Sequence, residues 1–215
     1  DVVAANVVER AIALCEYEKP DDVFVKEIGI ISYNRYNNTI KEIDDKLKKY
    51  TMLVVTNNNA AAKNITMTVG AAGGLNVILK ALLNPGDEVI TFAPYFGEYR
   101  SYVNNFDGVL VEISPNTVDF QPKLDEFEAK ITPKTKAVIV NTPNNPTGVV
   151  YSEETIRKMA EIMEKKQNEY GTEIYLISDE PYRELAYDGV DVPYLTRYYA
   201  NTIVGYSYSK SLSLP

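Results

Sequence analysis

Histidine and tryptophan are both absent from this 215-residue chain. The lack of imidazole excludes a histidine general base and a Ser-His-Asp triad. It also removes the commonest metal ligand, and we predict no metal site. Any chemistry must therefore use carboxylates, lysine, tyrosine or a bound cofactor.

Cysteine, basic charge and long apolar runs are scarce as well. The single cysteine, Cys15, excludes an internal disulfide and suits a reducing compartment, so we expect a cytoplasmic protein. Lys and Arg total 22 against 30 acidic residues, a net charge of −8, which argues against a nucleic-acid partner. No apolar run is long enough to span a bilayer and no cleavable signal pattern begins the chain, so we expect no membrane partner.

The composition that remains is that of a globular protein, with 45% hydrophobic and 24% charged residues. From residue 64 onward, short apolar runs typical of strands alternate with helical spacing of apolar residues. The runs cover residues 65–69, 88–93, 109–113, 136–141, 174–177 and 202–206, and the helical patterns cover about 75–83, 97–104, 124–131 and 152–163. This alternation predicts a mainly parallel, open α/β sheet with helices on both faces.

Residues 1–63 are less regular. Apolar spacing predicts helices over about 2–18 and 40–50, and the run Asn57–Ala62 is low in complexity, as in a connector. We therefore divide the chain into an N-terminal helical segment with its connector, residues 1–63, and an α/β domain, residues 64–215.

Small and polar residues gather where the predicted strands end, which is where open parallel sheets bind ligands. The run Gly70–Gly74 lets a phosphate approach the free N–H groups of a helix start, although close helix–sheet packing explains it equally well. It is not the Gly-x-Gly-x-x-Gly dinucleotide pattern. Phe96 follows another strand and can stack on a flat ring or serve as a core aromatic.

Two ionisable residues narrow the chemistry further. Asp179 follows an apolar strand, where a buried carboxylate needs a cationic partner such as a protonated ring nitrogen; a turn cap is the alternative. Asn145 and Tyr182 can donate to an oxygen on the same ring, although Asn144–Gly148 is also typical of a tight turn. Lys210 follows the last strand among small hydroxyl residues, where it can hold a carbonyl cofactor as a Schiff base or belong to a serine-rich surface loop.

Taken together, these motifs resemble the fold-type I pyridoxal phosphate enzymes, specifically the class I and II aminotransferase family. The resemblance covers about residues 64–215 and rests on Val69–Ala72, Ala93–Phe96, Asn141–Gly148, Ser178–Tyr182 and Ser207–Lys210. It implies the large domain of such an enzyme, the cofactor pyridoxal 5'-phosphate, amino-acid and 2-oxo-acid substrates and a homodimer. The implied activity is amino-group exchange; the alternatives are a C–S lyase, a decarboxylase, or cofactor binding without turnover.

The resemblance also implies a role for each matched residue. Lys210 holds the cofactor and moves a proton, Asp179 pairs with the ring nitrogen, and Tyr182 bonds the 3' oxygen; these three are the expected catalytic residues. The resemblance implies further contacts with the cofactor from five residues. Asn145 bonds the 3' oxygen and Phe96 stacks on the ring. The amides of Ala71 and Ala72 and the Ser207 hydroxyl hold the phosphate. Cis peptides are implied at Ala93–Pro94 and Asn145–Pro146.

The chain departs from the family pattern at both ends. It stops five residues after Lys210, before the glycine and the two arginines that family members carry downstream, one for the phosphate and one for the substrate carboxylate. We therefore expect the large domain to be incomplete at its C-terminus. Residues 1–63 lack the family's glycine-asparagine-proline motif, as expected for a fragment or a redesigned N-terminal part.

Overall fold

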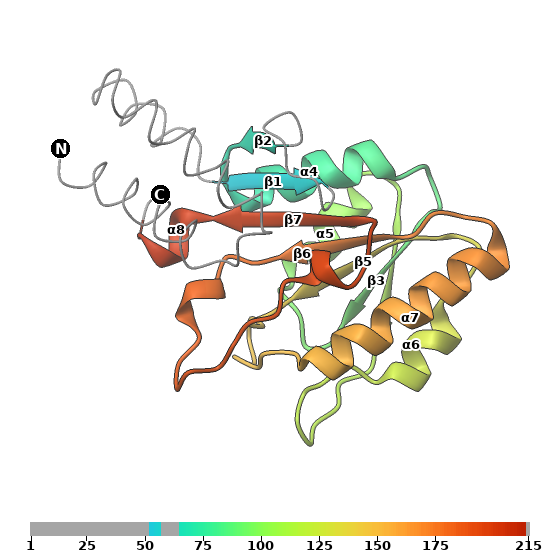
Figure 1. Ribbon diagram of the computed structural model, residues 1–215. Helices are drawn as coiled ribbons and strands as arrows, with labels where there is room; N and C mark the ends of the chain where they lie inside the picture. Colours follow the sequence, from blue (N-terminus) through green and yellow to red (C-terminus); the bar gives the residue numbers. More distant parts are fainter. Residues whose placement is uncertain (1–51, 57–64, 214–215) are drawn as a thin grey trace.

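The computed structural model describes residues 52–56 and 65–213, which form a seven-stranded sheet in the order β2-β1-β7-β6-β5-β3-β4 (Figure 1). The neighbours from β7 to β4 pair in parallel, whereas β1 is antiparallel to both β2 and β7. The strands are β1 (Met52–Thr56), β2 (Ile65–Thr68), β3 (Glu88–Phe92), β4 (Val109–Ile113), β5 (Thr135–Asn141), β6 (Tyr175–Asp179) and β7 (Thr202–Ser207). The predicted, mainly parallel sheet is confirmed.

Helices cover both faces of this sheet (Figure 1). One face carries α4 (Gly70–Leu82) and α5 (Glu98–Asn104), and the other carries α6 (Leu124–Lys130) and α7 (Glu153–Tyr170). Three short helices complete the described part of the chain. The 3₁₀-helices η2 (Arg183–Leu185) and η3 (Leu195–Arg197) follow β6, and α8 (Tyr208–Ser211) follows β7. None of the helices in the described residues combines the length and hydropathy that crossing a membrane requires.

The central strands are apolar on both sides because each contributes to two cores. In β5, Val138 and Val140 pack in the cluster beneath α6 and α7, whereas Ile139 packs in the cluster beneath α4 and α5. Successive side chains of a strand point to opposite faces, which explains this alternation. In β6, Ile177 faces α4 and α5, so Asp179 two residues later is directed to the same face.

β1 is the main difference from the expected order. We predicted Met52–Thr56 as part of a helical segment and connector, but these residues form a strand between β2 and β7. The run Met-Leu-Val-Val-Thr, followed by three asparagines, is a strand signal that the division at residue 63 did not use. Its pairing with residues 65–68 and 203–207 is a tertiary contact that local spacing does not reveal. The predicted helices over 2–18 and 40–50 and the Asn57–Ala62 connector lie outside the described residues.

The helix boundaries differ from expectation at the glycine run. α4 begins at Gly70, which has a φ of 67°, so Gly70–Gly74 forms the first turns of the helix instead of a loop before it. The predicted start of α7 is confirmed, since the Ser152 side chain accepts a hydrogen bond from the Thr155 N–H at 3.1 Å.

Candidate active site

The carboxyl ends of the parallel strands meet at one edge of the sheet. Asn141 at the end of β5 is level with Asp179 at the end of β6, which is level with Gly205 in β7. Ser207 and Thr68, the last residues of β7 and β2, lie opposite the same residue of β1. The segments that follow these strands therefore leave the sheet at the same edge, as expected from the sequence.

Asp179 is a deeply buried ionisable group at this edge, with 5% of its surface exposed. Its Oδ2 accepts a hydrogen bond of 2.5 Å from the Tyr99 hydroxyl, and its Oδ1 has no hydrogen-bond partner within the part of the chain that the structure describes. Burial raises the pKa of Asp179 to about 6, opposed by the Tyr99 bond and reinforced by the Glu180 charge. A buried, unpartnered carboxylate oxygen is costly, so the geometry fits a cationic group placed at Oδ1.

Tyr99 is a site residue that the sequence analysis missed. It lies in α5 with 1% of its surface exposed, and burial together with the Asp179 charge raises its pKa well above the usual value. It therefore stays protonated and donates to Asp179. The Phe96 ring meets the Tyr99 ring edge-on, with 5.7 Å between centroids. The signal available in the sequence was the three-residue spacing from Phe96, which places both side chains on one side of a helical turn.

A chain of hydrogen bonds ties Asn145 and Tyr182 to the same strand ends. The Asn145 backbone N–H donates to Asn141 Oδ1 at 2.6 Å, and Asn141 Nδ2 donates to the Asp179 carbonyl at 2.8 Å. Asn145 Nδ2 in turn donates to the Tyr182 hydroxyl at 3.2 Å. Asn141 lies in a matched motif but had no predicted role; the structure makes it the link between β5 and β6. The peptides before Pro94 and Pro146 are cis, as expected, and so is the one before Pro143.

Ser207 and Lys210 lie further along the edge, beyond β7. Ser207 is buried, and its Oγ accepts from the Ser209 N–H at 3.2 Å, which caps the short helix α8. Lys210 lies within α8, and its side chain is exposed. It makes no hydrogen bond or ion pair with any residue that the structure describes. No hydrogen bond or ion pair among the described residues joins Lys210 to Asp179; the pairing of β6 with β7 is what brings their segments to one edge of the sheet.

Ala71 and Ala72 occupy the first turn of α4, where backbone N–H groups have no partner within the helix. No acidic side chain lies in that turn, so its positive end is free to attract an anion. A Cβ added at Gly73 would meet only the Val69 Cβ, at an ordinary 3.9 Å. Close helix–sheet packing therefore does not account for glycine at position 73.

The Tyr99 hydroxyl tunes the ionisation of Asp179. In Tyr99→Phe the Oδ2 atom loses the Tyr99 bond, and neither carboxylate oxygen then has a partner in the described residues, so we expect the pKa of Asp179 to rise from about 6 by about one further unit, the size of one hydrogen bond to a charged group. Titration of cofactor affinity against pH measures this, because the affinity for a cationic ring should fall as Asp179 is protonated. Tyr102→Phe in the same helix removes a bond to Glu98 and should leave the midpoint unchanged.

Comparison with known proteins identifies relatives over most of the chain. The family profile described as "Aminotransferase class I and II" matches residues 32–215. A probable aspartate/prephenate aminotransferase of Thermus aquaticus is 44% identical over 124 residues, which are 57% of this chain and 31% of the relative. The aspartate aminotransferase of Thermotoga maritima is 33% identical over 182 residues, covering 84% of this chain and 43% of the relative.

A solved structure agrees with these relatives. The crystal structure of an amino transferase from Eubacterium rectale superimposes with a TM-score of 0.71 and 36% identity, over 100% of this chain and 51% of that one. The chain thus spans less than half the length of the two curated relatives named above. The family match begins at residue 32, earlier than the motif resemblance, which begins near residue 64.

Proposed function

We propose that this chain, which belongs to the class I and II aminotransferase family, binds pyridoxal 5'-phosphate and exchanges an amino group between an amino acid and a 2-oxo acid. The observation that carries the proposal is the buried Oδ1 of Asp179, without a partner in the described residues, on a carboxylate that Tyr99 holds by its other oxygen. With a pKa of about 6, this carboxyl group is mostly ionised at neutral pH. It suits a protonated ring nitrogen, which supplies both a hydrogen bond and a compensating charge.

Three further side chains suit the ring itself. Because the Tyr182 hydroxyl already accepts from Asn145 Nδ2, its own proton is available to an oxygen on the ring, and the second Asn145 N–H can point to the same oxygen. The Phe96 ring, which the Tyr99 ring meets edge-on, suits a contact with the face of the cofactor ring. We assign Tyr182, Asn145 and Phe96 to these contacts.

The phosphate is assigned to the other part of the edge. The N–H groups of Ala71 and Ala72 belong to a 13-residue helix whose first turn carries no acid. The Ser207 hydroxyl, at the end of β7, is level with the end of β2 that leads into this helix. These three groups are neutral and would bind an anion without adding a titrating charge. The Ser207 hydroxyl, which donates to Ser209 Oγ at 2.9 Å, would turn its proton to that anion.

Lys210 is assigned the chemical step. When bound, pyridoxal phosphate supplies an aldehyde that condenses with an amine, releasing water, and a ring that draws electrons from the substrate Cα–H bond. The Lys210 Nζ is exposed and makes no hydrogen bond or ion pair with the described residues, so we assign to it the attachment of such an aldehyde and the later transfer of the proton that leaves the substrate Cα. A lysine amine can accept that proton only while it is neutral.

Absorption spectroscopy tests the proposal. Adding pyridoxal phosphate to the purified protein is expected to produce a visible band, and adding amino acids one by one should replace it with the band of the amine form of the cofactor. Absence of any band contradicts cofactor binding. A band that no amino acid converts indicates binding without turnover, and release of ammonia with pyruvate, or of carbon dioxide, indicates a lyase or a decarboxylase.

A homodimer and a cytoplasmic location also remain proposals. Their support is the family membership for the first and the single cysteine, Cys15, for the second. Sedimentation of the cofactor-loaded protein measures the oligomeric state directly.

A further inference from the structure

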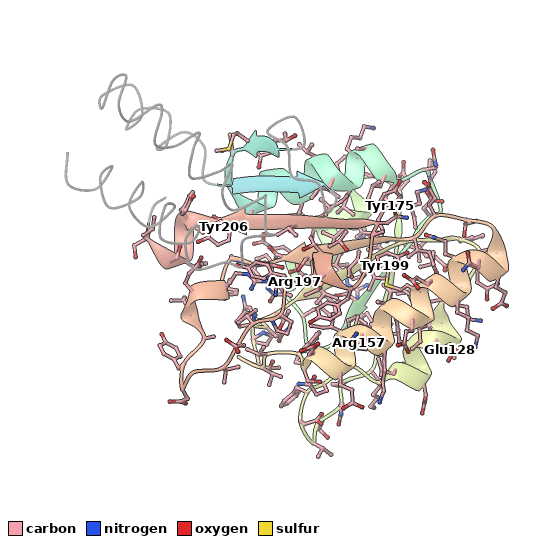
Figure 2. The ribbon with its side chains drawn as sticks, in the orientation of Figure 1. Glu128, Arg157, Tyr175, Arg197, Tyr199 and Tyr206 are labelled. Carbon is pink, nitrogen blue, oxygen red and sulfur yellow. The ribbon has the colours of Figure 1, made fainter. Side chains whose placement is uncertain are left out.

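The short helix that carries Lys210 is held from both faces of β7. On one face Ser207 caps the helix, and on the other lies Tyr206, because neighbouring residues of a strand point to opposite sides. The Tyr206 hydroxyl donates to Glu184 Oε1 at 2.6 Å and lies 3.0 Å from Ser211 Oγ. Figure 2 shows Tyr206 where β7 leads into α8. Since Ser211 directly follows Lys210, this second contact fastens the helix on the far side of the lysine.

The Tyr206 side chain is held in place by contacts of both its ring and its hydroxyl. Its ring packs edge-on against the ring of Tyr208, the first residue of α8, with 5.2 Å between centroids. Burial, followed by the Glu184 charge, raises the pKa of Tyr206 above its usual value, so its hydroxyl keeps its proton and acts as a donor. The ring therefore locates the start of α8, and the hydroxyl locates its end.

Glu184 connects this arrangement to the residues that we assign to the ring. It lies in η2, two residues after Tyr182, and η2 is anchored by a 2.7 Å ion pair between Arg183 and Glu180. Glu180 is 1% exposed, and its other oxygen accepts from Ser178 in β6 at 2.6 Å. The Tyr206–Glu184 bond thus joins the segment of Lys210 to the segment of Asp179 and Tyr182 by a side-chain contact, in addition to the pairing of β6 with β7.

We propose that Tyr206, through Glu184 and Ser211, is a positioning residue that directs Lys210 toward the ring-binding side chains. The proposal rests on the function proposed above. An exposed lysine has four rotatable bonds, so a fixed backbone limits the region that its amine samples. Loss of the Tyr206 hydroxyl should therefore impair attachment of an aldehyde to Lys210 and spare the contacts to ring and phosphate.

Binding of two cofactor forms to the purified protein tests this inference. Pyridoxal phosphate carries the aldehyde, and pyridoxamine phosphate lacks it but shares the ring and the phosphate. In Tyr206→Phe we expect the dissociation constant for pyridoxal phosphate to rise about tenfold, the size of one hydrogen bond to a carboxylate, and that for pyridoxamine phosphate to change less than about twofold. Glu184→Gln keeps an acceptor oxygen for Tyr206, so this variant should retain most of the wild-type affinity for pyridoxal phosphate.

Tyr199→Phe is the matched control, because it removes a buried hydroxyl that donates to the Ile174 carbonyl at the opposite end of β6. It should change neither constant. Equal weakening of both ligands by Tyr206→Phe, or no weakening of either, overturns the positioning role, and thermal unfolding of each variant reports any general loss of fold. If the wild-type protein gives no visible band, the proposed function has failed; a wild-type band with an unaffected Tyr206→Phe variant rejects the positioning role alone.

Discussion

The Lys210→Ala protein is expected to lose the visible band with pyridoxal phosphate and to transfer amino groups about 10²–10⁴-fold more slowly than the wild type. The reason is that Lys210 is assigned both the attachment of the aldehyde and the movement of the Cα proton. Its Nζ is the only amine in α8, whose residues follow the end of β7 beside the proposed phosphate and ring contacts. Single-turnover kinetics with one amino-acid substrate measures the loss.

Lys158→Ala is a matched control for this experiment. Lys158 is an exposed lysine of α7 that pairs with Glu154 on the outer surface of the other helical layer. Its replacement should leave the band and the rate unchanged. A normal band in Lys210→Ala would show that another amine holds the cofactor, and the assignment of Lys210 would then be wrong.

Asp179→Asn is expected to slow the same half-reaction on the order of 10²–10³-fold, comparable to removing one group that stabilises developing charge. The asparagine amide keeps the size of the side chain and can still accept from Tyr99, but it carries no negative charge. The ring nitrogen then loses the partner that favours its protonated form, and the ring draws electrons less strongly. Asp125→Asn, at an exposed carboxylate of α6, should not alter the rate.

The same substitution should have the opposite effect on stability in the absence of cofactor. The pKa of Asp179 is raised from 3.8 to about 6 in the folded protein, so between these values the folded state binds more protons than the unfolded state. Stability therefore falls as pH rises from about 4 to about 6, and the full cost, about 3 kcal/mol, is present above that window. Asparagine does not titrate and escapes this cost.

Denaturant unfolding of the cofactor-free proteins measures this effect. Relative to the wild type, Asp179→Asn should gain about 3 kcal/mol in unfolding free energy between about pH 4 and about pH 7, because other titrating groups cancel in the difference. A difference that does not change with pH would mean that Asp179 is not a raised, buried acid. The pairing of lost activity with gained stability is the mark of a residue retained for its ligand.

Much of the fold could be predicted because its determinants are local. The apolar runs of β3 to β7 and the helical spacing of α4, α6 and α7 lie close to their predicted ranges, and the Ser152 cap is where its side chain indicated. Asp179 could be singled out because a carboxylate that closes a strand containing Leu176 and Ile177 is unusual at a buried position. Lys210 drew attention in the same way, as a lysine among small hydroxyl residues.

The rest depends on contacts between residues that are distant in sequence. Tyr99 and Asp179 are 80 positions apart, and Tyr206 and Glu184 are 22 apart, so neither hydrogen bond has a signature in local spacing. The β-branched residues of β1 favour a strand, but its position between β2 and β7 depends on pairing that no local signal reveals. Sequence spacing thus indicated the groups that we assign to the cofactor but not the groups that hold them in place.

Reduction with borohydride tests the central claim most directly, because it makes the bond between the cofactor and its lysine permanent. The purified protein would be incubated with pyridoxal phosphate, reduced, digested and mapped by mass spectrometry. We predict that the added mass lies on Lys210 and that Lys210→Ala protein carries none. Recovery of the cofactor on a different lysine, or of no bound cofactor at all, would contradict the assignment of this site.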